Sequence, residues 1–210
     1  MFAARSSVQA TVRSRLRPKS ILLALDVPGE MPQRQVADVL VQFGPSAIDP
    51  LLGILDNPEA PDSELTIAVR VSGMLRAKAA LPRLLKLLRH SAVDVRLNCV
   101  RALASIGDTA AILPISELAK DPAWEVRNSV MHALGGMRTK EYVPLFVQCL
   151  TDLAWWVRYS AAQALYKAGD AGMEALLNAA GHHADHFARD ISRQILQEHG
   201  FYQASQEVLP

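Results

Sequence analysis

The sequence predicts an all-α fold, a right-handed α-solenoid of about five helical hairpins. The main observation is a set of residue types that recur every 31 positions. A fixed period in this range is typical of solenoids, in which each unit buries its apolar face only by stacking on the next unit. Three columns carry the period: Val95, Val126 and Val157; Arg96, Arg127 and Arg158; Leu103, Leu134 and Leu165.

The period divides the chain into three predicted parts. Residues 1–19 form a basic N-terminal arm or first helix, residues 20–200 form the repeat solenoid, and residues 201–210 form a C-terminal tail. Residues 1–25 contain five basic residues and no acidic residue. Three interpretations of this arm stay open: a solvated segment that caps the solenoid, a segment next to an upstream membrane anchor, and an organelle transit peptide.

Two helices are expected before the regular repeats. Residues 35–43 have apolar side chains at positions 36, 39, 40 and 43, which is helical spacing, and Gly44-Pro45 ends this helix. Residues 48–55 form the next helix. The linker at residues 57–63 contains two prolines and two acidic residues, and it interrupts the register of the repeat.

From residue 64 to residue 200 the register holds without a gap, and each repeat reads as a helix A, a turn and a helix B. In the repeat centred on Arg127, helix A is expected near residues 110–120, the turn at 121–122 and helix B near 123–137. The last copy, residues 181–200, has Ala188 in the valine column. A terminal repeat is expected to be atypical because one of its faces meets water.

Composition excludes some classes of protein. Half of the residues are apolar and a fifth are charged, which is typical of a globular protein. Five of the 22 basic residues lie in residues 1–25, so residues 26–210 carry 17 basic and 21 acidic residues, a net charge of −4. This balance argues against nucleic-acid binding, although Arg70 and Arg101 keep a DNA-binding alternative open. No run of about 18 apolar residues predicts a membrane span.

Cys99 and Cys149 are the two cysteines, and both fall in columns of small or apolar residues. Free thiols that serve as small hydrophobic side chains are expected, which favours a reducing, cytoplasmic location.

The repeats resemble HEAT repeats, specifically the short type of phycobilisome-lyase-like proteins. The resemblance covers about residues 30–200 and rests on the pairs Asp121…Arg127 and Asp152…Arg158, on the helix-A prolines, and on the AAQAL segment of helix B. It implies that helix B lines the concave side. It also implies structural roles, in which the turn Asp caps helix B and the Arg bonds the neighbouring turn. His90, Asp121, Asp152 and His183 occupy this turn column.

A metal site or a catalytic site is not expected. His182, His183 and His186 with Asp185 and Asp190 are the densest cluster of metal-ligand types, but a polar turn with His183 in place of the Asp is favoured. There is no His-Glu pair of the kind found in HEAT-repeat hydroxylases, and no P-loop or Rossmann glycine pattern. The chain is therefore predicted to be no enzyme and to need no cofactor.

Helix B supplies the candidate binding residues. Two of its columns should point away from the core and vary between repeats, as a binding groove would. They are Arg70, Arg101, His132, Gln163 and Gln194, and Thr66, Leu97, Asn128, Tyr159 and Asp190. Trp124, Trp155 and Trp156 begin helix B and either pack the turn or form an aromatic ridge, in which Trp156 is the better anchor because its column holds Asp94 and Glu125.

The sequence thus predicts a non-enzymatic scaffold that binds a protein partner in the concave helix-B groove. Two alternatives remain: a bilin lyase or isomerase-like subunit, from the resemblance alone, and the soluble part of a membrane-associated assembly, from the basic N-terminus. The candidate partner-binding residues are Arg70, Arg101, His132, Tyr159, Gln163, Tyr166 and Trp156.

Overall fold

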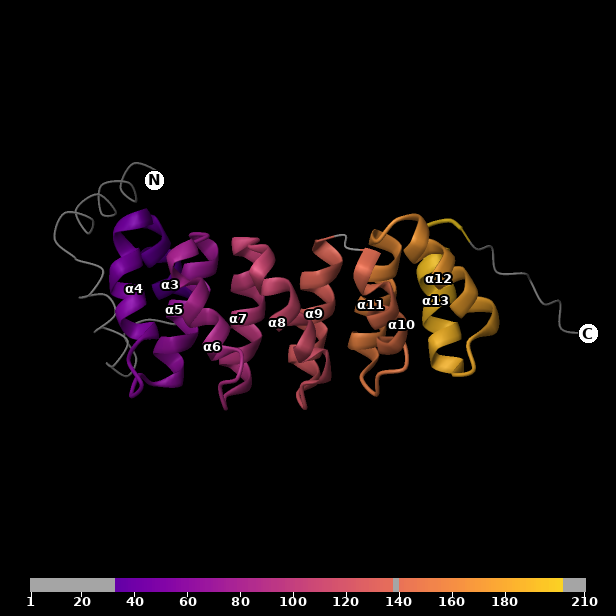
Figure 1. The fold of residues 1–210 in the computed structure, drawn as a ribbon, viewed down its shortest axis with the longest axis horizontal. Coiled ribbons are helices and arrows are strands. Elements are labelled where there is room, and N and C mark those ends of the chain that lie inside the picture. Colours follow the sequence, from indigo (N-terminus) through magenta and orange to yellow (C-terminus); the bar gives the residue numbers. More distant parts are fainter. Residues whose placement is uncertain (1–32, 138–139, 202–210) are drawn as a thin grey trace, which may run out of the picture. The chain divides into compact units, whose positions relative to one another are not determined.

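The computed structural model describes residues 33–137 and 140–201, and all regular structure in these residues is helical (Figure 1). The predicted N-terminal arm and all of the tail except Phe201 lie outside the described residues. Within 33–137 and 140–201, we find no helix with both the length and the apolar character that crossing a bilayer requires.

The chain divides into two compact units, Met1–Ala111 and Ile112–Pro210. In the first unit, α5 packs on α7 and is also contacted by α3 and α4, while α6 packs on α7. The short helical turns Gly44–Ala47 and Lys78–Ala80 lie between helices of this unit, and the turn Thr109–Ala111 follows its last helix. The helices of this unit are α3 (Gln33–Gln42), α4 (Ile48–Leu55), α5 (Asp62–Met74), α6 (Leu81–Leu87) and α7 (Val93–Ile106).

In the second unit, α11 packs on α9 and also contacts α10, α12 and α13, and α12 packs on α13. Short turns at Leu118–Lys120 and Lys140–Tyr142 join the helices. The helices of this unit are α8 (Ile112–Glu117), α9 (Trp124–Gly136), α10 (Val143–Cys149), α11 (Trp155–Lys167), α12 (Asp170–His182) and α13 (His186–Glu198).

The predicted period is confirmed by where the helix-B helices begin. Each starts 31 residues after the one before, at Asp62, Val93, Trp124, Trp155 and His186. The first of them, α5, begins inside the segment expected to be linker, because Pro61 supplies an extended residue directly before the first helical turn. Four helix-A elements, α4, α6, α8 and α10, are shorter than the helix-B helices and carry a proline in the first turn, where its missing N–H removes no helical hydrogen bond.

The repeat columns form the cores of the two units. The valine and leucine columns are fully buried, and Ala188 and Leu196 continue them in the last repeat. Cys99 and Cys149 are free and buried, as expected for thiols that pack as small hydrophobic groups. Burial raises the pKa of Cys149 to about 11 and raises that of Cys99 further, so both thiols stay protonated at neutral pH.

Candidate functional site

The turn before each helix B is built the same way in the four copies from His90 to His183. Asp121 Oδ1 accepts a hydrogen bond of 2.9 Å from Ala123 N, and Asp152 Oδ1 accepts one of 2.8 Å from Ala154 N. His90 and His183 accept the equivalent bonds through Nδ1, at 3.2 and 3.1 Å. The acceptor thus bonds the backbone N–H two residues later, which closes an Asx-type turn.

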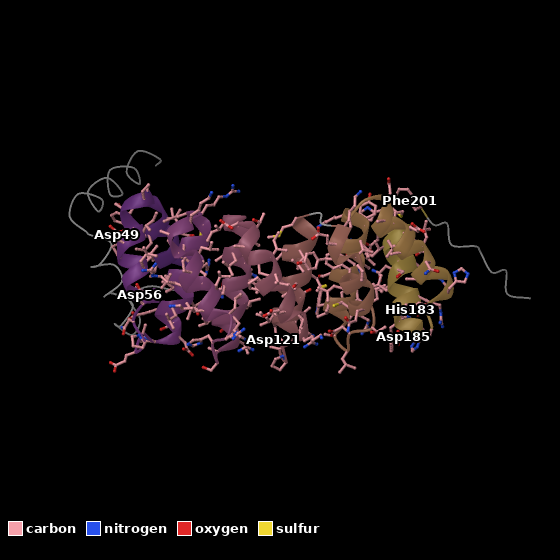
Figure 2. All side chains as sticks on the ribbon, in the orientation of Figure 1. Asp49, Asp56, Asp121, His183, Asp185 and Phe201 are labelled. Atoms are coloured by element: carbon pink, nitrogen blue, oxygen red, sulfur yellow. The ribbon has the colours of Figure 1, made fainter. Side chains whose placement is uncertain are left out.

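This geometry corrects the expected helix cap. In α9 and α11 the N-cap residues are Ala123 and Ala154, so the Asp holds the N-cap residue and does not itself cap the helix. A side-chain N-cap occurs in α13, where Asp185 accepts from Ala188 N at 2.9 Å. Figure 2 shows Asp121, His183 and Asp185 along one edge of the second unit.

The predicted arginine ladder is present between Arg127 and the next turn. Arg127 donates through Nη1 to the carbonyl oxygens of Asp121 and Pro122, at 2.8 and 3.1 Å, in its own turn. It also donates through Nε and Nη2 to both carboxylate oxygens of Asp152, at 2.7 and 2.8 Å. Burial raises the pKa of Asp152, but the bonds from Arg127 and Ala154 outweigh that effect, and the pKa lies below its usual value.

The ladder changes where a histidine occupies the turn column. Arg158 donates to the carbonyl oxygens of Asp152 and Leu153, at 2.8 and 3.2 Å, but the following turn offers His183 in place of a carboxylate. Arg158 Nε is buried and has no hydrogen-bond partner among the residues that the structure describes. Its guanidinium lies over the ring of Phe187, 4.7 Å from the centroid, in a cation–π contact that the sequence did not reveal.

Two histidines of the predicted cluster make structural contacts in the turn before α13 and at the start of that helix. His183 accepts the backbone bond already described, and the ring centroids of His186 and Phe187 are 3.9 Å apart. In residues 33–137 and 140–201, no three His, Cys, Asp or Glu side chains are placed to hold a metal ion.

On the exposed face of α11 and α13, Tyr159 is the centre of a hydrogen-bonded chain. Its hydroxyl donates to Glu198 Oε2 at 3.1 Å and accepts from Gln163 Nε2 at 3.2 Å. Gln194 Nε2 donates to the other oxygen of Glu198 at 2.8 Å. Two predicted site residues, Tyr159 and Gln163, are therefore in direct contact and held in place by the neighbouring helix.

The tryptophans at the start of α11 adjoin this chain. The ring of Trp155 stacks on Tyr159 with centroids 5.0 Å apart, and it meets Trp156 edge-on at 4.8 Å. Trp155 is 41% exposed and Trp156 is 56% exposed. The predicted ridge residue Trp156 and the predicted groove residue Tyr159 thus belong to one surface, linked by Trp155.

The other two predicted residues of the second unit lie elsewhere on the helix-B face. Ser160 Oγ donates to Asn128 Oδ1 at 2.7 Å and lies 3.1 Å from Nε2 of His132, so His132 faces α11. Tyr166 stacks on the ring of His199 with centroids 3.7 Å apart, near the end of α13. Glu198, Trp155 and Ser160 were not among the predicted site residues, although the four-residue spacing of Trp155 and Tyr159 on one helix indicates their contact.

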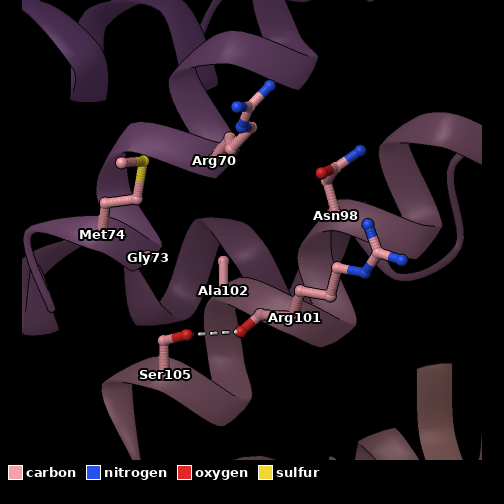
Figure 3. Close-up of a pocket in the computed structure, with 7 residues that line it drawn as sticks. All are labelled: Arg70, Gly73, Met74, Asn98, Arg101, Ala102 and Ser105. Atoms are coloured by element: carbon pink, nitrogen blue, oxygen red, sulfur yellow. Dashed lines mark hydrogen bonds between the residues drawn. The ribbon is translucent and has the colours of Figure 1, made fainter. Parts of the chain in front are cut away.

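In the first unit, Arg70 and Arg101 line one pocket of about 150 Å³ between α5 and α7. Figure 3 shows the polar ends of Arg70, Asn98 and Arg101 on one side of this pocket, with Met74 and Ser105 on the other. Beside the pocket α5 and α7 approach closely, and only glycine fits at position 73. A Cβ on Gly73 would lie 2.6 Å from the Cα of Ala102. The sequence had placed the two arginines in one column but had not indicated a pocket.

The comparisons with known proteins agree with this architecture. A family model described as HEAT repeats matches residues 48–134 and 112–197. Among the curated proteins, none matches the chain.

Solved structures with the same fold include natural and designed repeat proteins. The complex of CpcE and CpcF of phycocyanin lyase from Nostoc sp. PCC7120 is 20% identical, with a TM-score of 0.60 over 85% of this chain and 75% of that chain. A designed armadillo repeat protein in complex with the peptide (KR)4 is 20% identical, with a TM-score of 0.54 over 89% of this chain and 100% of that chain. These likenesses and the helices confirm the predicted all-α solenoid class.

Proposed function

Because this chain belongs to the HEAT-repeat family, we propose that it is a non-enzymatic scaffold that binds a protein partner on the exposed face of its helix-B helices. In the first unit this face is formed by α5 and α7, and in the second unit by α9, α11 and α13. The repeated residues are committed to the core and to the turns, so the varying residues of the helix-B face are the ones left for recognition.

The observation that carries this proposal is the contiguous surface of Trp156, Trp155 and Tyr159. Two exposed tryptophans in contact present a large apolar area to water, and exposed aromatic patches of this kind are typical of protein interfaces. Tyr159 is held by Gln163 and Glu198, so its ring loses little conformational freedom when a partner binds.

A similar fold is compatible with peptide binding. The designed armadillo protein that shares it is a complex with the peptide (KR)4, and the natural neighbour is a complex of two chains. These cases support a peptide or protein as the molecule that binds the helix-B face. Which peptide or protein binds depends on the side chains that this chain presents on that face.

Affinity capture from the native host, followed by calorimetry with the captured partner, tests the proposal. Alanine variants of Arg70, Arg101, His132, Tyr159, Gln163, Tyr166 and Trp156 are compared with wild type. At least one should bind more weakly by about 1 kcal/mol or more, because hot-spot residues are few and often aromatic or arginine. Leu113→Ala is the matched control, since Leu113 is exposed on the helix-A element α8.

If Leu113→Ala weakens binding and all seven helix-B variants bind normally, the partner docks on helix A and the proposal is wrong. The alternatives are tested with the same preparation. A bilin that binds and changes its absorption spectrum would favour the lyase alternative, and co-sedimentation with anionic liposomes would favour the membrane-associated one.

A further inference from the structure

The pocket between α5 and α7 contains two cations that have no partner in the described part of the chain. Neither the guanidinium of Arg70 nor that of Arg101 has a hydrogen bond or an ion pair within residues 33–137 and 140–201. Other arginines of the same unit do have structural roles. Arg83 makes a bidentate pair with Asp56 at 2.8 and 2.7 Å, and Arg96 donates to the carbonyl oxygens of its turn.

The backbone brings these two side chains to the same place. Arg70 lies one helical turn before Gly73, and Arg101 directly precedes Ala102, so both flank the closest approach of α5 and α7. Figure 3 shows the two guanidinium groups and the Asn98 amide on the same side of the pocket. Because Asn98 Nδ2 is engaged with the Asp94 carbonyl oxygen at 2.7 Å, the side chain of Asn98 is fixed beside them.

The equivalent positions two repeats later show that packing does not require these charges. Gly135 and Ala164 make the same close approach between α9 and α11, with a Cβ on Gly135 2.8 Å from the Ala164 Cβ. The positions of Arg70, Asn98 and Arg101 are occupied there by His132, Ser160 and Gln163. Ser160 bonds Asn128 and lies against His132, and Gln163 bonds Tyr159, so that copy satisfies its polar groups internally.

We propose that the pocket of Arg70, Asn98 and Arg101 binds the carboxylate of an Asp or Glu in a peptide segment of the partner, with an apolar neighbour of that residue against Met74. This inference rests on the proposed protein-binding function. Guanidinium groups pair with carboxylates through charge-assisted and often bidentate hydrogen bonds. The volume of about 150 Å³ is well below that of a typical cofactor site, and it suits a single side chain.

A nucleic acid is the less favoured occupant. Recognition of a phosphate backbone uses a row of basic side chains along a surface, whereas residues 26–210 carry 17 basic and 21 acidic residues. Gly73, Met74 and Ala102 also give the pocket an apolar wall, which fits a peptide side chain better than a sugar–phosphate chain.

The test selects peptides from a phage-displayed library of random dodecamers against the full-length protein. Synthetic versions of the enriched peptides are then measured against wild type, Arg70→His, Arg101→Gln and Arg89→Gln. The first two substitutions introduce the residues that the second unit has at the equivalent positions, so this helix packing accepts them. Arg89 is exposed at the end of helix A and outside the pocket, and its substitution removes the same charge.

We expect enriched peptides with Asp or Glu beside Leu, Ile or Met. Their affinity should fall about tenfold or more in Arg70→His or Arg101→Gln, as for loss of one charge-assisted hydrogen bond, and change less than about twofold in Arg89→Gln. Equal losses of affinity in all three variants would show that the overall charge of the protein, and not this pocket, attracts the peptides, and the proposal would be wrong. Enriched peptides without acidic residues would also contradict the proposal. So would a dodecameric oligothymidylate that displaces the peptides, if its binding depends on Arg70 and Arg101.

Variants of the second unit separate this inference from the proposed function. If Trp156→Ala or Tyr159→Ala abolishes peptide binding and the arginine variants do not weaken it, the helix-B face binds peptides but the acidic pocket is wrong. If no variant on the helix-B face weakens any selected peptide, both the pocket and the proposed function are wrong. Thermal melts of each variant, unchanged from wild type, show that a loss of binding is not a loss of folding.

Discussion

Arg127 donates through Nε and Nη2 to the two carboxylate oxygens of Asp152, at 2.7 and 2.8 Å, and so joins the turns of consecutive repeats in the second unit. Both side chains are largely buried, with 15% and 11% of their surface exposed. The same carboxylate also holds its own turn through Ala154 N. Breaking one partner of a buried ion pair leaves the other charge uncompensated, so this pair should be important for stability.

Asp152→Asn should lower the free energy of unfolding at pH 7 by about 3 kcal/mol, the usual effect of breaking such a pair. The amide oxygen can still accept from Ala154 N, so the turn itself is retained. In the wild type the pKa of Asp152 lies below the value of about 4 expected in the unfolded chain. Its contribution is therefore present above about pH 4 and is lost as the pH falls through the folded-state pKa.

Urea unfolding measured from pH 7 to pH 2 checks this prediction. The difference in unfolding free energy between wild type and Asp152→Asn should be constant above about pH 5 and should shrink below pH 4. Glu174→Gln, at an exposed position of α12, is the control and should keep the wild-type pH profile. A difference that stays constant down to pH 2 would show that the pair does not depress the pKa of Asp152.

Core columns allow a second prediction with a matched control. Leu134 is fully buried in α9, whereas Leu153 is 97% exposed in the turn before α11. Leu134→Ala should lower the free energy of unfolding by about 2–5 kcal/mol, because it leaves a cavity in the core. Leu153→Ala removes the same atoms from water and should change stability by less than about 0.5 kcal/mol. Similar denaturation midpoints for the two variants would contradict the assigned register of helix B.

The repeat period made the core and the helix-B elements predictable. A residue type that recurs every 31 positions must occupy the same environment in each copy, so Val126 and Leu134 could be assigned to the core without a structure. The period also indicated that His183 replaces the turn Asp. It did not distinguish an N-cap from an Asx-type turn, because the two differ only in which backbone N–H the side chain reaches.

The candidate site was predictable only in part. The columns identified which side chains leave the core, and Arg70, Arg101 and Tyr159 do so. Which of them meet depends on how far neighbouring helices are rotated and how closely they approach. Tyr159 reaches Glu198, 39 residues later in the sequence, through the packing of α11 on α13, and no spacing in the sequence specifies that contact.

The close approach of α5 and α7 gives a third prediction. A methyl group on Gly73 would lie 2.6 Å from the Ala102 Cα, a backbone atom that cannot yield, so Gly73→Ala should lower the free energy of unfolding by about 1–3 kcal/mol. Within residues 33–137 and 140–201, Gly53 in α4 has no atom within 4 Å of its ideal Cβ. Gly53→Ala should instead raise stability by about 0.5–1 kcal/mol, since alanine is the better helix former.

Chemical denaturation of both variants measures the two effects with opposite signs. A stabilising Gly73→Ala would mean that the helices can separate slightly at no cost, and the pocket beside them would then be wider than described. The sign of the change in unfolding free energy for Gly53→Ala shows whether replacing an unhindered helical glycine by alanine stabilises this protein, as helix propensity predicts.

The fourth prediction restores the carboxylate that the last turn lacks. In His183→Asp, the new side chain can accept from Asp185 N, as Asp152 accepts from Ala154 N, and can also accept from the buried Nε of Arg158, which now has no partner. A hydrogen bond to a charged group contributes about 1.5–3 kcal/mol, and the cation–π contact of Arg158 with Phe187 that it disturbs contributes about 0.5–1 kcal/mol. The free energy of unfolding should therefore rise by about 1–2 kcal/mol at pH 7.

A double-mutant cycle isolates the new pair. In an Arg158→Gln background the histidine substitution should give no gain, because the cation that the carboxylate would bind has been removed. If the gain in unfolding free energy persists in the Arg158→Gln background, the added stability comes from the turn itself and not from the new pair. If the single variant is less stable than wild type, the stacking of Arg158 on Phe187 is stronger than the ion pair that replaces it.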